Sequence, residues 1–143
     1  MEEQTVVLLK ECNAGCKMAI NSMERLKEYV KNASLNELLE EYKKQHRELE
    51  EESARLLEES GETQKQPDLM ASAFSWLTTE LKMMVQDDST QIAKILMNGC
   101  NMGIQSVSEC MNKCPKASHA GMSVAKKLVK CEENLMEDVK KFL

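Results

Sequence analysis

Apolar residues recur along this chain at intervals of three and four positions, the spacing that places side chains on one face of an α-helix. This spacing predicts helices over residues 3–32, 34–60, 68–86, 90–113 and 118–143. Gly61 and Pro115 lie where two of these helices should end. A glycine can adopt the left-handed conformation of a C-cap, and a proline cannot continue a helix. Almost the whole chain is therefore expected to be helical.

The predicted helices group into two hairpins joined by a long connection. Hairpin one spans residues 3–60, the crossover 61–88 contains the short helix 68–86, and hairpin two spans residues 89–143. Helical hairpins bury their apolar stripes by packing against each other as a bundle. A chain of 143 residues is too short to divide into two domains, so we expect a single domain over residues 1–143. The predicted fold is all-α, an up-down four-helix bundle with an extra short helix in its crossover.

A short pattern occurs twice, once in each predicted hairpin. Residues 15–22 read GCKMAINS and residues 99–106 read GCNMGIQS, with glycine, cysteine, methionine, isoleucine and serine at matching positions. The repeat predicts a pseudo-two-fold relation between the two hairpins. Its small residues predict that two helices approach each other closely here, so one interpretation of the repeat is packing alone.

Composition narrows the classes of partner. The net charge is −5, so there is no basic surface to match a nucleic-acid backbone, and we expect no nucleic-acid partner. No apolar run approaches the roughly 18 residues that a membrane span requires. The first residues are acidic and lack the basic and apolar regions of a signal peptide, which predicts a cytoplasmic protein.

Six cysteines stand out in a chain with only two histidines. In a reducing cytoplasm they are buried small residues, metal ligands or redox thiols rather than a disulfide framework. Four candidate ligands lie on predicted inward stripes: Cys16, His46, Cys100 and Cys131. Three thiolates and an imidazole form a tetrahedral set suited to zinc, and to copper(I) or iron. The alternative is a bundle core that contains these side chains without a metal.

The layout of two hairpins around the segment LMASAFSWLTTELKMMVQDDSTQIAKIL resembles the ferritin-like four-helix bundle proteins of bacteria, in particular an uncharacterised family of them. The resemblance implies an acidic residue just after a glycine in the first and third long helices. Here Cys16 follows Gly15 and Cys100 follows Gly99. It also implies an inward histidine in the last helix, where this chain offers Cys131. Cysteines thus replace the usual carboxylate and histidine ligands.

The ligands of a ferritin-like di-iron centre are not expected in this chain. Such a centre uses two Glu-x-x-His pairs, but Lys43 and Lys116 stand three residues before His46 and His119. The acidic residues of the segment 48–59 fall off the apolar stripe and predict a solvated helix face. Inward-facing glutamates are hard to find on the apolar stripes, so ferroxidase or catalase chemistry is not expected. We assign no role to His119.

These observations favour a non-catalytic cytoplasmic bundle that binds a soft metal through core cysteine and histidine. One alternative is a structural, interaction or stress module, comparable to a spore-coat component, without a metal. Another is copper(I) sequestration through the C-x-x-x-C pairs Cys12/Cys16 and Cys110/Cys114, which place two thiols on one helix face. The short helix 68–86 either caps the bundle or forms a homodimer contact.

Overall fold

The computed structural model describes residues 2–62, 77–82 and 88–143, and every regular element within these ranges is helical. The helices are α1 (Glu3–Lys27), α2 (Ala33–Glu59), α4 (Ser89–Lys113) and α5 (His119–Val139), followed by the short 3-10 helix η1 (Lys140–Phe142). Residues 77–82 are helical as well. The predicted all-helical character is confirmed for the described residues. The rest of the predicted helix 68–86 lies outside them.

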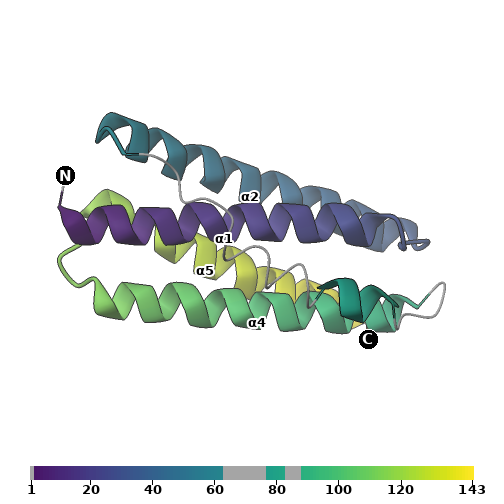
Figure 1. Ribbon diagram of the computed structural model, residues 1–143. Coiled ribbons are helices and arrows are strands. Elements are labelled where there is room, and N and C mark those ends of the chain that lie inside the picture. The colour runs from purple at the N-terminus through teal and green to yellow at the C-terminus, as the bar shows by residue number, and fades with distance from the viewer. Residues whose placement is uncertain (1, 63–76, 83–87) are drawn as a thin grey trace.

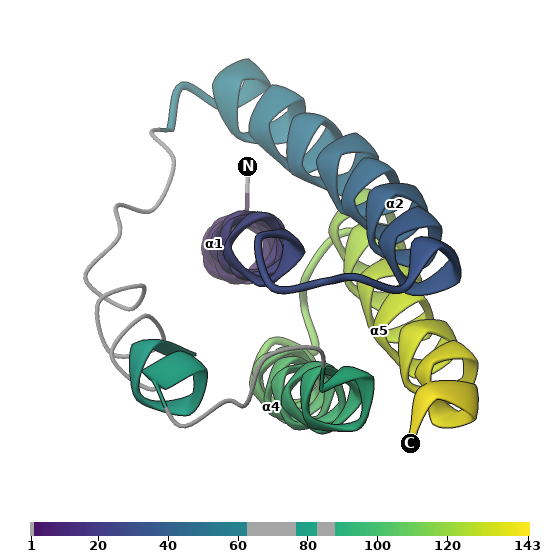
Figure 2. The same ribbon diagram turned by 90° about the vertical axis from the view of Figure 1, so that its right-hand side faces the viewer.

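The four long helices pack side by side along their lengths (Figure 1). Helices α1 and α5 form the central pair, because each of them contacts the other three. Helices α2 and α4 flank this pair, as the view along the helices shows (Figure 2). One side of α1 therefore faces α2, and another faces α4.

Hydrogen bonds between distant segments define the direction of α4 relative to α1. At one end, the Ser118 amide that follows α4 donates to Thr5 Oγ1 at 2.7 Å. At the other end, Arg25 of α1 donates to Thr78 Oγ1 at 3.2 Å, and Gln91 of α4 donates to Glu80 at 3.4 Å. The end of α4 thus lies beside the start of α1, and the two helices are antiparallel.

The ends of the helices follow local capping chemistry. Helix α1 ends at Lys27 rather than near residue 32, because Asn32 serves as the N-cap of α2 and accepts a hydrogen bond from the Leu35 amide at 3.0 Å. The second helix therefore starts at Ala33, one residue before its predicted start at residue 34. Gly61 follows α2 with a φ of 78°, which confirms the left-handed cap.

The core consists of aliphatic and sulfur-containing side chains, as the scarcity of aromatic residues predicts. Its largest fully buried members include Leu8, Leu9, Leu26, Leu35, Leu39, Leu57 and Leu128. A polar contact crosses the interface of α1 and α2, where Asn13 Nδ2 donates to Ser53 Oγ at 3.1 Å. Among the described residues, no helix combines the length and apolar character needed to cross a bilayer.

Candidate functional site

The two copies of the repeat lie antiparallel, one on α1 and one on α4, and together they line a cavity. Its volume is about 380 Å³. Four matched pairs of the repeat contribute to its wall: Gly15 and Gly99, Met18 and Met102, Ala19 and Gly103, and Ser22 and Ser106. The repeat therefore surrounds an open space between two helices.

This arrangement differs from the close helix contact that the small residues predict. A Cβ atom placed on Gly99 would meet no atom within 4 Å, and one on Gly15 would meet Leu128 of α5 at 3.7 Å. Neither glycine is needed for contact between α1 and α4. The small residues instead leave the volume of the cavity unfilled.

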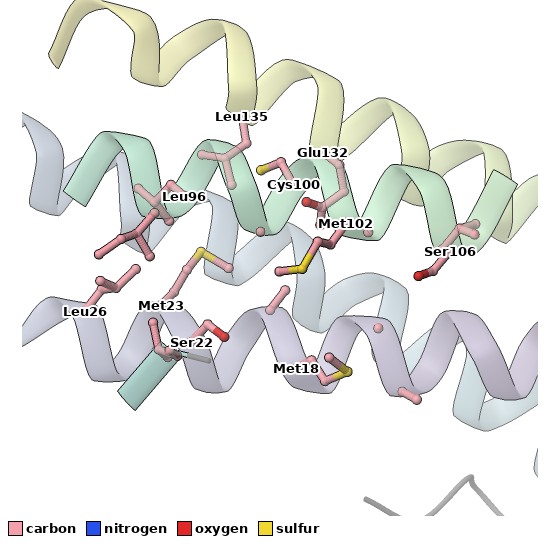
Figure 3. A pocket seen from close by; sticks show the side chains of 18 of the residues that line it. Met18, Ser22, Met23, Leu26, Leu96, Cys100, Met102, Ser106, Glu132 and Leu135 are labelled. Carbon is pink, nitrogen blue, oxygen red and sulfur yellow. The ribbon is translucent and has the colours of Figure 1, made fainter. Parts of the chain in front are cut away.

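Larger apolar and sulfur-containing side chains complete the cavity (Figure 3). The labelled residues come from three helices: Met18, Ser22, Met23 and Leu26 from α1, Leu96, Cys100, Met102 and Ser106 from α4, and Glu132 and Leu135 from α5. Leu26 and Leu96 lie together at one end. Two charged groups, Glu11 of α1 and Glu132 of α5, lie in an otherwise mainly apolar wall.

Glu132 forms a buried pair with His46 of α2. The His46 side chain is 0% exposed and Glu132 is 7% exposed, and His46 Nε2 lies within hydrogen-bond distance of Glu132 Oε1. The other ring nitrogen, Nδ1, lies 2.6 Å from the Tyr42 carbonyl oxygen, which can only accept a hydrogen bond. Both ring nitrogens therefore face acceptors, the environment that favours an imidazolium beside a carboxylate.

The charge state of His46 reflects two opposing effects. Burial alone would lower its pKa, but hydrogen bonds with Cys131 and Glu132 outweigh burial and raise the pKa of His46 from 6.5 to about 10. Cys131 Sγ lies 3.8 Å from His46 Nδ1. The neighbouring carboxylate thus keeps the imidazole protonated at neutral pH.

Burial has the opposite consequence for the thiols near this pair, because it disfavours the thiolate. Burial raises the pKa of Cys12 to about 12, with a further contribution from Cys110. Burial also raises the pKa of Cys16 and of Cys100, and Glu132 and Cys131 add to both shifts. These thiols are therefore protonated and weakly nucleophilic at neutral pH.

The structure buries all four members of the predicted quartet. His46 and Cys131 are in contact, while Cys16 and Cys100 are each coupled to Cys131 and Glu132. Within the described ranges of the chain, no group of three or more His, Cys, Asp and Glu side chains that could hold a metal ion is found. The quartet as a metal site stays a prediction.

The remaining candidate residues lie away from this centre. His119 is exposed at the first turn of α5, and Cys114 is buried while Cys110 is partly exposed. Cys12 is buried on α1, and Cys110 lies on α4, which ends at Lys113, one residue before Cys114. All six cysteines are free thiols.

Glu132 is a residue of the candidate site that was not predicted from the sequence, where inward-facing glutamates were expected to be rare. Glu132 lies four residues after Leu128 and three before Leu135, both of which are buried on α5. It therefore lies on the apolar stripe itself. The helical spacing of Leu128, Glu132 and Leu135 is the sequence signal that predicts an inward direction for Glu132.

Comparison with known proteins leaves the resemblance untested. No family model, no curated protein and no solved structure matches this chain. The described residues therefore form an all-helical structure with a cavity between α1 and α4, whose wall includes Glu132, the buried partner of His46.

Removing one partner of the buried pair should destabilise the fold strongly. The change His46→Leu leaves the Glu132 charge buried without a partner, and we expect a loss of about 3–5 kcal/mol in the free energy of unfolding. The double change His46→Leu with Glu132→Met removes both charges and should recover most of that loss. Urea unfolding of the three proteins measures the effect, and a double variant no more stable than His46→Leu would contradict the pairing.

Stability should also depend on pH through His46. Its pKa is raised from 6.5 to about 10 in the folded state, so its contribution is complete below pH 6.5 and is lost as the pH rises through 10. The free energy of unfolding of the wild type should therefore fall, relative to that of the double variant, as the pH rises from 6.5 to 10. Other groups titrate in both proteins and cancel in the difference. A constant difference in melting temperature across this range would show that His46 is neutral.

Proposed function

We propose that this chain is a non-catalytic binding protein whose ligand is a small apolar molecule held between α1 and α4. The observation that carries the proposal is the cavity of about 380 Å³ lined by both copies of the repeat. Small-molecule pockets in proteins measure roughly 300–1,000 Å³ and combine apolar walls with a few polar groups. The volume and the lining residues of this cavity match that description.

A ferritin-like four-helix bundle is the architecture we propose for the chain. Two antiparallel hairpins with a long connection between α2 and α4 support it. A di-iron centre would require several inward carboxylates, whereas Glu132 is the one buried carboxylate among the residues that the structure describes. We therefore favour binding over oxidation chemistry. The six free thiols support a reducing compartment such as the cytoplasm.

A soft metal ion is the second candidate ligand. The observation that favours it is the sulfur in the cavity wall, where the thioethers of Met18, Met23 and Met102 accompany the thiol of Cys100. Thioether and thiol ligands select copper(I) over harder ions. This candidate places the metal in the cavity rather than within the predicted quartet, so the two metal sites can be tested separately.

Filling the cavity should abolish binding of an apolar probe. The Cβ position of Gly99 is surrounded by open space, so Gly99→Leu should place its side chain in the cavity without a clash. We expect a gain of about 1 kcal/mol in stability from helix propensity and the loss of ethylnaphthalene binding. Naphthalene fluorescence and thermal denaturation measure the two effects.

The neighbouring residue supplies a matched control. Asn98→Leu adds the same side chain to an exposed position of α4 and should leave ethylnaphthalene binding intact. Equal binding by the wild type and Gly99→Leu would contradict the cavity as the ligand site. A wild-type chain that binds no apolar probe would instead favour the structural or interaction module.

Metal-binding measurements on two double variants should distinguish a metal site at the quartet from a metal site in the cavity wall. If zinc or copper(I) binds through the quartet, it should raise the melting temperature of the wild type and leave a Cys16→Ala/Cys100→Ala variant unchanged. A Met18→Leu/Met102→Leu variant keeps the packing volume and should lose only a copper(I) site in the cavity. A melting temperature of the wild type that responds to neither ion would exclude both metal sites.

A further inference from the structure

Glu132 presents its two carboxylate oxygens to different surroundings. Oε1 faces His46, as described above. Oε2 lies beside Gly103 of α4, where an added Cβ atom would be 3.6 Å from it. Both Glu132 and Gly103 line the cavity. Because Gly103 has no side chain, no Cβ atom of α4 covers the second oxygen on that side.

The repeat differs at this position. Ala19 occupies the place in the first copy that Gly103 occupies in the second. A contact at 3.6 Å is an ordinary van der Waals distance, so the packing would also accept an alanine at Gly103. The glycine is therefore not required by sterics, and its effect is to leave space next to Glu132 Oε2.

The charges around the carboxylate restrict which ligand group can occupy that space. The His46 imidazolium already balances the Glu132 charge, and Glu11, the other carboxylate of the wall, is partly exposed, so a cationic group beside Glu132 would add a buried charge without a partner of its own. A carboxylate would be repelled by Glu132. An uncharged hydrogen-bond donor carries neither cost, and a carboxylate has lone pairs to accept further hydrogen bonds beside the one to His46.

We propose that the ligand of this cavity is an uncharged, mainly apolar molecule with a hydroxyl group that donates a hydrogen bond to Glu132 Oε2. This inference rests on the proposed binding function and adds the chemical class of the ligand. The thioethers of Met18 and Met102, with Leu26, Leu96 and Leu77, contact its apolar body. Glu132 selects the alcohol over the hydrocarbon and over the acid of the same shape.

Three fluorescent probes of similar shape test the selection: ethylnaphthalene, naphthylethanol and naphthylacetate. Hydrogen bonds to charged groups contribute about 1.5–3 kcal/mol, so naphthylethanol should bind the wild type about tenfold or more tightly than ethylnaphthalene. Naphthylacetate should bind more weakly than both. Fluorescence titration of the full chain gives the three dissociation constants.

Two alanine variants on the same helix locate the contact. Gly103→Ala covers Glu132 Oε2 and should reduce the preference for naphthylethanol over ethylnaphthalene to near one. Asn98→Ala changes an exposed residue of α4 outside the cavity wall and should keep the preference. Both changes are small and favour helix, so both variants should fold.

The outcomes separate this inference from the binding function itself. If ethylnaphthalene binds and naphthylethanol binds no better, the inference is overturned while the binding function stands. Equal effects of Gly103→Ala and Asn98→Ala on the preference would also overturn it. If none of the three probes binds the wild type, both proposals fail.

Discussion

The buried contact between His46 and Glu132 constrains the packing of this molecule more than any apolar contact. It joins α2 to α5, and the Tyr42 carbonyl on α2 holds the other side of the imidazole. An apolar stripe can slide by one turn and still bury its leucines. A slide here would leave a buried carboxylate without its partner, at a cost of several kcal/mol. The pair therefore makes one alignment of α2 on α5 far more stable than its neighbours.

The same pair shapes the interface between α1 and α4. Glu132 extends from α5 toward α4, with its far oxygen next to Gly103. Small residues of the repeat on both antiparallel helices leave room beside it, while the leucines at one end, Leu26 and Leu96, close the space. The cavity thus results from the distribution of large and small side chains along two helices that α5 holds in place.

Most of the fold could be predicted from the sequence because it depends on helical periodicity and on local caps. The inward direction of His46 and the burial of Cys16, Cys100 and Cys131 follow directly from their apolar stripes. The cavity could not be predicted in this way, since a glycine such as Gly99 is compatible with close contact or with open space. Which of the two occurs depends on how the facing helix is positioned.

Glu132 was missed for a different reason. Its charge predicted an exposed position, although its place on the apolar stripe of α5 predicted a buried one. The ferritin-like family stays a resemblance, and the metal quartet stays a prediction.

Two features of the cavity lower stability without a packing reason, and they lie on the same wall. A glycine inside a helix costs about 1 kcal/mol relative to alanine, yet Gly99 and Gly103 both stand within α4, where a methyl group would fit. A buried ion pair can be replaced by apolar residues with little loss, or even a gain, in stability. Selection for stability alone would therefore favour alanines on α4 and an apolar pair in place of His46 and Glu132. Gly99, Gly103 and Glu132 all line the cavity, where the proposed ligand would require both the space and the hydrogen-bond acceptor.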